Sequence, residues 1–299
     1  MPFTIAALYH FFDFSDFKEC RQLLKSEMLR LDIKGSLLIA PEGINGTLAG
    51  TREGMDGFLD YLRKEIIKGP FEHKESLCDH QPFKRTKVRL KKETISLGVP
   101  PPLGGRLGGG LVETPPVQRP HPGPPPNGEG VHFIEPKDWN ALIADPDVII
   151  LDTRNDYETH LGTFAGAIDP KTKNFKQLPD FIRHTLSDAK QKKIATFCTG
   201  GIRCEKLAPW MAAQGFEEVY QLKGGILKYL EEIPQAESKW QGECFVFDNR
   251  VAVGHGLVPS RDATMCRPCG QPLMAEDRAH PLYIEDVRCP YCPAKRDND

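Results

Sequence analysis

The first third of the chain alternates between continuous apolar runs, which are typical of strands, and segments whose apolar residues recur every three or four positions, which are typical of helices. Residues 16–31 place apolar side chains three or four positions apart, which predicts a helix with one apolar side made of Phe17, Cys20, Leu23, Leu24, Met28 and Leu31. The full predicted order is a strand at 3–12, a helix at 16–31, strands at 34–41 and 46–50 joined by a turn at 42–45, a helix at 52–65 and a strand at 86–93. This β-α-β-β-α-β order predicts a ferredoxin-like sandwich over residues 1–97.

Residues 98–130 have a composition unlike the segments on either side. Glycine and proline make up 19 of these 33 residues. Such a stretch buries too little apolar surface to offset the entropy lost on ordering, so we expect a linker that is partly extended at 124–126. The alternative is a proline-rich segment that binds a partner.

After this linker, strand-like and helix-like segments alternate. The predicted elements are a helix near 136–144, a strand at 148–152, a helical stretch at 174–186, and strands at 193–197 and 218–222. The alternation predicts a doubly wound parallel sheet over 131–240, followed by a C-terminal extension at 241–299.

A glycine-containing segment, Cys198-Thr-Gly-Gly-Ile-Arg203, follows one of these strands. Gly200 and Gly201 allow the loop to turn its backbone N–H groups toward one point, and together with Arg203 they favour a thiolate at Cys198. We therefore interpret Cys198 as a reactive thiol, with a buried structural cysteine as the alternative. Cys204 is either a thiol that resolves an oxidised or persulfidated Cys198 or part of the core.

Polar residues also follow the strand at 148–152. Asp152 and Arg154 come directly after its apolar run, and Glu158 lies four residues further on. In a parallel α/β sheet the carboxyl ends of the strands meet at one edge, where active sites gather. We therefore expect Asp152 and Arg154 at the same edge as Cys198.

Composition narrows the class of protein. Of the 299 residues 39% are hydrophobic and 27% charged, and the formal net charge is −2, so any nucleic-acid site must be local. No apolar run approaches the length of a membrane-spanning helix, and the first residues lack a signal-peptide pattern. We expect a cytoplasmic protein without a membrane partner, whose nine cysteines are thiols or metal ligands.

Four of these cysteines form two pairs near the C-terminus. Cys266-Arg-Pro-Cys269 is followed after 19 residues by Cys289-Pro-Tyr-Cys292. This spacing is typical of a zinc ribbon, in which two Cys-x-x-Cys knuckles supply a tetrahedron of thiolates. We predict structural zinc at these four cysteines. A flexible reduced tail and redox-active thiols are the alternatives.

The motifs of the second domain resemble those of the rhodanese (sulfurtransferase-like) domain. The resemblance rests on Asp152-Thr-Arg-x-x-x-Glu158 followed by Cys198-x-Gly-Gly-x-Arg203. It implies that Cys198 is the catalytic residue, which carries a persulfide in sulfurtransferases. It also implies that Arg203 binds an anion or stabilises the loop, and that Asp152, Arg154 and Glu158 are mainly structural supports.

The whole layout, apart from the linker, is similar to the bacterial tRNA uridine(34) hydroxylases, a rhodanese-containing family. The segments that carry this similarity are 40–47, 87–93, 152–158, 198–206, 221–227 and 240–250. They imply oxygen-dependent hydroxylation of the wobble uridine at C5, giving 5-hydroxyuridine, with molecular oxygen and an unidentified reductant as co-substrates and the tRNA anticodon loop as partner. Cys198 would add to C6 of the uracil or carry redox equivalents as a persulfide or sulfenate. The sequence shows no flavin, haem or nicotinamide motif, and its linker is longer than the short connector expected in this family.

Positive charge is most concentrated at 84–92, where six of nine residues are basic. On a strand, alternate residues share one face, so Lys87, Arg89 and Lys91 could line a track for RNA phosphates. A solvated strand face is the alternative. The predicted substrate-binding and RNA-binding residues are Lys84, Arg85, Lys87, Arg89, Lys91 and, from the turn at 42–45, Asn45.

Two other functions stay open at this point. A sulfurtransferase would pass sulfane sulfur through a Cys198 persulfide. A non-catalytic RNA-binding adaptor would use the basic strand and the zinc tail and would tolerate the loss of Cys198. The sequence leaves the oligomeric state open.

Overall fold

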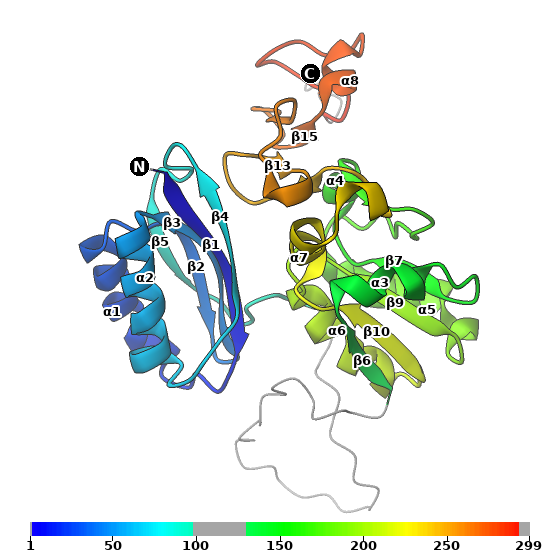
Figure 1. The fold of residues 1–299 in the computed structure, drawn as a ribbon, viewed down its shortest axis with the longest axis horizontal. Helices are drawn as coiled ribbons and strands as arrows, with labels where there is room; N and C mark the ends of the chain where they lie inside the picture. The colour runs from blue at the N-terminus through cyan, green and yellow to red at the C-terminus, as the bar shows by residue number, and fades with distance from the viewer. Residues whose placement is uncertain (1, 98–129, 293–299) are drawn as a thin grey trace, which may run out of the picture. The chain divides into compact units, whose positions relative to one another are not determined.

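The structure is a computed structural model that describes residues 2–97 and 130–292 (Figure 1). The linker predicted at 98–130 therefore lies outside the described residues, apart from Gly130.

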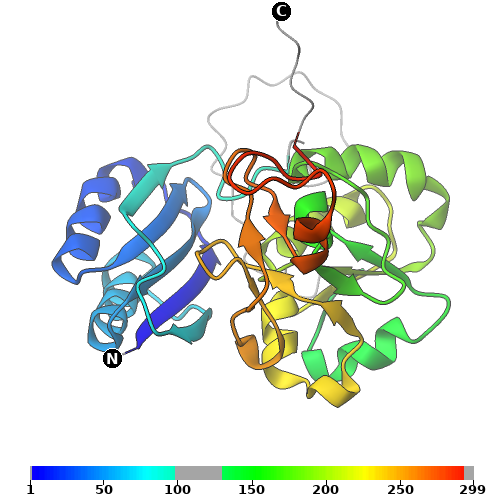
Figure 2. The same ribbon diagram turned by 90° about the horizontal axis from the view of Figure 1, so that it is seen from above.

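The N-terminal part is a five-stranded sheet with the order β4-β1-β3-β2-β5, and helices α1 and α2 cover one of its faces (Figures 1 and 2). All its strand pairs are antiparallel except β2 with β5. The first four strands in this order form the predicted ferredoxin-like sandwich, which is thereby confirmed. Its elements are β1 (Phe3–Phe11), α1 (Phe17–Arg30), β2 (Lys34–Ala40), β3 (Gly43–Gly50), α2 (Arg52–Tyr61) with a π-helical continuation (Leu62–Ile66), β4 (His73–Cys78) and β5 (Thr86–Leu90).

Strand β4 corrects the predicted strand count. The sequence prediction assigned the last ferredoxin strand to 86–93, but β4 takes that place and β5 is an additional strand at the opposite edge of the sheet. The segment His73–Cys78 was missed because it lacks an apolar face: only Cys78 in it is buried. The predicted turn at 42–45 is also shorter, because β3 already begins at Gly43 and contains Asn45.

The core of this part lies between the sheet and its two helices. Leu24 and Met28 of α1 pack there with Leu37 of β2 and Phe58 of α2, all fully buried. Leu23, which the helical spacing placed on the same side, is 59% exposed. Since neighbouring residues on a helix point about 100° apart, burying Leu24 turns Leu23 to the edge of the apolar face.

The second part is built on a four-stranded sheet with the order β6-β10-β9-β7, in which β7 and β9 run parallel. The side chains of α3 and α7 share one apolar cluster with residues of β7, β9 and β10. The predicted alternation of strands and helices is confirmed. The main elements are β6 (Val131–Ile134), α3 (Pro136–Ile143), β7 (Ile149–Asp152), α4 (Asp156–Thr159), β8 (Gly162–Phe164), α5 (Leu178–Thr185), β9 (Lys193–Phe197), α6 (Ile202–Ala213), β10 (Glu218–Leu222) and α7 (Gly225–Glu232), with 3-10 turns at Phe175–Gln177, Ser187–Ala189 and Gln235–Glu237.

The C-terminal segment continues from this second part through an aromatic cluster. Strand β11 (Trp240–Gly242) pairs antiparallel with β8. The ring of Phe164 lies 5.1 Å from that of Trp240, 4.9 Å from Phe197 and 4.8 Å from Tyr229. The remaining elements are short: β12 (Cys244–Phe245), β13 (Ala252–Val253), a 3-10 turn (His255–Leu257), β14 (Thr264–Met265), β15 (Pro272–Leu273) and α8 (Ala275–Ala279). Among the described residues, no helix combines the length and the apolar character needed to cross a membrane.

Candidate active site around Cys198

The predicted reactive loop lies between β9, which ends at Phe197, and α6, which begins at Ile202. Arg203 and Cys204 therefore stand in the first turn of α6. Gly201 has a φ of +99°, a left-handed conformation that glycine adopts without strain. Its N–H donates a hydrogen bond to the Cys198 Sγ at 3.1 Å. The loop therefore directs backbone donors at the sulfur.

The Cys198 thiol is only 1% exposed. Burial by itself raises the pKa of this thiol. A hydrogen bond from Cys204, the positive charge of Arg203 and the backbone N–H groups of Arg203 and Cys204 outweigh burial and lower the pKa of Cys198 to about 6. A thiol with such a pKa is a thiolate, the nucleophilic form, at neutral pH.

Cys204 is the side-chain donor in this arrangement. It is fully buried, and burial followed by its interaction with Cys198 raises its pKa well above the ordinary value for a thiol. Cys204 therefore stays protonated and donates a hydrogen bond to the Cys198 sulfur. Its Sγ also lies 3.5 Å from the hydroxyl oxygen of Thr153, which itself donates to the carbonyl of Phe197 at 2.8 Å.

Glu158 holds the guanidinium of Arg203 beside the loop. Arg203 Nη2 lies 2.8 Å from Glu158 Oε2, and both side chains are almost completely buried. Thr199 Oγ1 donates to the same carboxylate oxygen at 3.3 Å, and the backbone N–H of Asn155 donates to the other at 3.2 Å. Burial opposes the charge on Arg203, but Glu158 outweighs it and raises the pKa of the guanidinium.

One nitrogen of the Arg203 guanidinium makes no hydrogen bond to the described residues. This atom, Nη1, is buried. A buried donor of this kind is costly unless a ligand satisfies it. The guanidinium is therefore suited to bind an anionic or carbonyl oxygen close to the thiolate.

Asp152 and Arg154 form a second buried pair next to this site. Arg154 Nε donates to Asp152 Oδ1 at 2.9 Å and Nη2 to Oδ2 at 2.6 Å, with both side chains fully buried. Arg154 Nη2 also reaches the carbonyl of Gly162 at 2.6 Å, and its guanidinium lies 5.1 Å from the ring centre of Trp240. These contacts fasten the turn after β7 to β8 and β11. They support the site rather than touch the sulfur.

Gly225 is a supporting residue that the sequence reasoning missed. It has a φ of +65°, and a Cβ at this position would lie 2.5 Å from the Cys198 carbonyl oxygen and 2.7 Å from the Gly201 nitrogen. The N–H groups of Ile226 and Leu227 donate to the carbonyls of Cys198 and Thr199 at 2.9 and 3.0 Å. The start of α7 thus holds the loop carbonyls, which leaves the loop N–H groups to face the sulfur. The glycine pair after the strand at 218–222 was the available signal.

The predicted RNA-contact residues lie in or next to the N-terminal sheet: Lys87 and Arg89 in β5, Asn45 in β3, and Lys84, Arg85 and Lys91 beside β5. Lys84, Arg85, Arg89 and Lys91 are exposed and Lys87 is half-buried. The amide of Asn45 donates to the carbonyl of Thr94 at 3.2 Å, an internal contact within the same part of the chain. The structure therefore groups Cys198, Arg203, Glu158, Gly200 and Gly201 in one site and the four C-terminal cysteines in a cluster of their own, whereas the basic residues belong to the N-terminal part of the chain.

The lowered pKa of Cys198 predicts a specific pH dependence. We expect the ultraviolet absorbance of its thiolate, measured as the difference between the wild type and Cys198→Ser, to rise around pH 6 and to stay level above about pH 7.5. Replacing the donor, Cys204→Ala, moves the rise to higher pH because one stabilising hydrogen bond is lost. A rise centred near pH 9 in the wild type would contradict the proposed stabilisation.

The glycine that packs on the loop gives a second prediction. Gly225→Ala introduces a methyl group against the Cys198 carbonyl and an unfavourable φ, which alone costs about 1–2 kcal/mol. We expect a lower unfolding midpoint in urea and a higher pKa of Cys198. Gly254→Ala is the matched control, because nothing lies within 4 Å of its Cβ position and its φ of −98° suits alanine. Equal effects of the two substitutions would contradict the role given to Gly225.

Two family models match the two parts of the chain. Residues 3–94 match the family model of the UPF0176 acylphosphatase-like domain, and residues 135–232 match that of the rhodanese-like domain. Among solved structures, the rhodanese-like domain of an Anabaena protein is similar at 21% identity, covering 37% of this chain and 78% of that one (TM-score 0.31). A rhodanese-related protein from Thermoplasma volcanium shows 24% identity over 34% and 92% (TM-score 0.27). An acylphosphatase from Coxiella burnetii shows 9% identity over 29% and 90% (TM-score 0.23).

A rhodanese-like domain supports sulfurtransferase-like or related chemistry on a catalytic cysteine, and Cys198 stands in the matched segment. The chain therefore joins a UPF0176 acylphosphatase-like domain to a rhodanese-like domain.

Proposed function

We propose that this protein hydroxylates C5 of the wobble uridine of tRNA, with Cys198 as the catalytic thiol. The observation that carries the proposal is the buried Cys198 sulfur, whose pKa is lowered to about 6 by the donors and the positive charge around it. The combination of a UPF0176 acylphosphatase-like domain with a rhodanese-like domain supports it, as does the basic strand on the first of these.

The chemistry needs a nucleophile that works at neutral pH. Addition of the Cys198 thiolate to C6 of uracil saturates the C5–C6 bond and places negative charge on C5 and O4, so that C5 reacts with an oxidant. Over the whole reaction one atom of molecular oxygen is inserted at C5 and the other leaves as water, with two electrons and two protons supplied by an external donor. The unpaired Arg203 Nη1 is suited to stabilise the negative oxygen that forms. A persulfide or sulfenate at Cys198 is the other role consistent with this reaction.

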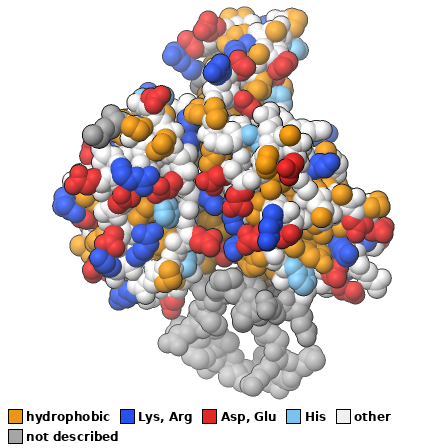
Figure 3. Space-filling view, in the orientation of Figure 1, with side chains coloured by type: hydrophobic (Ala, Val, Ile, Leu, Met, Phe, Trp, Pro, Cys, Tyr) orange, Lys and Arg blue, Asp and Glu red, His pale blue; other side chains and the backbone are white. Residues whose placement is uncertain are grey.

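Binding of an RNA substrate needs a local basic surface, because basic side chains at the phosphates supply most of the affinity. The net charge is −2, and basic and acidic side chains are interspersed on the face drawn in Figure 3. Strand β5 differs from this mixture: Val88 packs under the helices, so its neighbours Lys87 and Arg89 project from the opposite face of the sheet. Such a row of cations suits the phosphates of an anticodon loop, whose unstacked bases are open to chemistry without melting a duplex.

A sulfurtransferase is the second candidate, and the same Arg203 nitrogen favours it. Thiosulfate is an anion, and attack of the Cys198 thiolate on its outer sulfur gives a Cys198 persulfide and releases sulfite. The loop N–H groups that stabilise a thiolate suit a persulfide anion as well. A thiol or cyanide then accepts the outer sulfur.

Nucleoside mass spectrometry of tRNA tests the proposed function directly. In cells that lack the endogenous activity, we expect the wild type and Cys20→Ala to restore 5-hydroxyuridine derivatives and Cys198→Ala to restore none. Heavy-isotope oxygen gas supplied during the complementation should appear in the modified nucleoside. If no variant restores the modification while purified wild type converts thiosulfate and cyanide to thiocyanate, the hydroxylase proposal fails and sulfur transfer replaces it. Restoration by Cys198→Ala would favour the adaptor.

The basic strand gives a separate prediction about affinity. Changing Lys87, Arg89 and Lys91 together to glutamine should weaken tRNA binding and reduce the slope of log affinity against log salt concentration by about 2, since about 0.7 counterions are released per single-stranded phosphate contact. The charge-matched control changes three exposed lysines elsewhere in the same domain, Lys18, Lys64 and Lys68. Equal losses in the two triple variants, measured by filter binding, would show a diffuse electrostatic effect instead of a defined track.

A further inference from the structure

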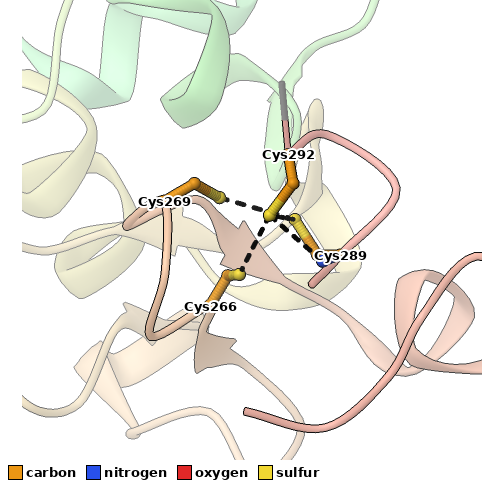
Figure 4. Close-up of side chains that lie close together, drawn as sticks. All are labelled: Cys266, Cys269, Cys289 and Cys292. Carbon is orange, nitrogen blue, oxygen red and sulfur yellow. Dashed lines mark hydrogen bonds between the residues drawn. The ribbon is translucent and has the colours of Figure 1, made fainter. Parts of the chain in front are cut away.

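The C-terminal segment brings together a second group of thiols, far along the chain from Cys198. The Sγ atoms of Cys266, Cys269, Cys289 and Cys292 all lie within 4.8 Å of one another, and Figure 4 shows the four side chains converging. Sulfur–sulfur distances in this cluster are 3.7 Å for 266–292, 3.5 Å for 269–289 and 3.8 Å for 289–292. All are much longer than a disulfide bond of about 2 Å.

These sulfur–sulfur distances match the edges of the tetrahedron that four thiolates form around a zinc ion. Zinc–thiolate bonds are about 2.3 Å long, and a regular tetrahedron with that radius has edges of about 3.8 Å. The three measured distances are 3.5, 3.7 and 3.8 Å. Four thiols therefore surround a space of the size that a Zn²⁺ ion requires, and four thiolates fill its coordination shell.

The backbone of both Cys-x-x-Cys segments is folded into tight turns. In the first, the N–H of Gly270 donates to the Cys266 carbonyl at 2.8 Å, and Gly270 has a φ of +75°. In the second, the N–H of Cys292 donates to the Cys289 carbonyl at 3.1 Å, and the Cys289 N–H donates to the Cys292 sulfur at 3.3 Å. Each turn brings its two sulfurs to the same side, and N–H donors to sulfur stabilise a thiolate ligand.

The apolar group around the cluster is small. It consists of Cys266, Leu273 and Cys289, with Tyr283 and Cys292 partly buried against them, so three of the five members are cysteines of the cluster. The nearby elements β14, β15 and α8 have two, two and five residues. A core this small does not offset the entropy of ordering the segment, whereas metal binding does.

One residue of the second turn connects the cluster to the rhodanese-like domain. The hydroxyl of Tyr291, between Cys289 and Cys292, donates to Asp277 Oδ1 at 2.5 Å. The other oxygen of Asp277 lies 2.8 Å from His160 Nε2, and the rings of His160 and Tyr291 are 4.9 Å apart. His160 directly follows α4, the helix that carries the Arg203 partner Glu158.

We propose that Cys266, Cys269, Cys289 and Cys292 bind one structural Zn²⁺, and that this ion fixes Tyr291 in the contact with Asp277 and His160 that holds residues 264–292 on the rhodanese-like domain. The ion has no open coordination position and takes no part in the reaction at Cys198. The proposal stands independently of the proposed function.

Metal analysis of the purified full chain tests the first half. We expect about one zinc per chain by elemental mass spectrometry and close to none in the double variant Cys269→Ser with Cys292→Ser. The matched control is Cys20→Ser with Cys78→Ser, two cysteines outside the cluster, which should keep the ion. Cobalt exchanged into the site should show the visible and thiolate-to-metal bands of tetrahedral four-thiolate coordination. Zinc well below one per chain in the wild type, iron in its place, or equal zinc in both double variants would overturn the assignment.

Hydrogen exchange of the full chain tests the second half without reference to activity. Tyr291→Phe should keep about one zinc per chain but increase exchange in peptides that contain His160 and Asp277. Removing the ion with a chelator should increase exchange in these peptides and also across both cysteine turns, by about tenfold or more. If exchange around His160 stays the same both in Tyr291→Phe and after removal of the ion, the role of the ion in fixing the contact of Tyr291 with His160 and Asp277 is overturned, even if zinc binds.

Discussion

A negative charge on a buried sulfur is the constraint around which the second domain is organised. Cys198 is 1% exposed, and burial alone would keep its thiol protonated. The loop opposes this effect with donors: the N–H of Gly201, the thiol of Cys204 and the first turn of α6. Each donor is useful only if its position is held, since a thiolate gains little from N–H groups that point elsewhere. The surrounding contacts supply that restraint.

The side chains that stabilise the thiolate are themselves held in place by a buried ion pair and by hydrogen bonds. Arg203 offsets the thiolate but is itself a buried cation, and Glu158 compensates it at 2.8 Å. Removing one partner of such a pair costs about 3–5 kcal/mol, because the other charge is left buried without compensation. Glu158 is in turn held by donors from Thr199 and Asn155. Helix α4, which carries Glu158, is followed directly by His160, which contacts Asp277 of the C-terminal segment.

The two family-matched domains and the C-terminal segment differ in what stabilises them. The N-terminal sandwich has a large apolar core between its sheet and helices, which leaves the edge strand β5 free to carry exposed cations. The rhodanese-like domain combines an apolar core with buried charges that serve the thiolate. In the C-terminal segment, residues 244–257 pack in apolar clusters with the rhodanese-like domain, whereas the apolar group around the four converging cysteines is small.

The sequence by itself determined the features that depend on local spacing. The helix at α1, the strand β9, the loop from Cys198 to Arg203 and the two Cys-x-x-Cys pairs could all be predicted, because periodicity and short motifs carry them. It did not reveal β4, whose edge position leaves its side chains mostly polar, or the outward turn of Leu23.

Only the tertiary structure decided which distant residues meet. Glu158 and Arg203 are 45 residues apart in the chain, and His160 and Asp277 are 117 apart. Gly225 meets the Cys198 carbonyl because α7 packs against the loop, a contact that no local pattern encodes. Such pairings arise from the packing of whole helices and strands, so the charge compensation at Cys198 became visible only once the elements were assembled.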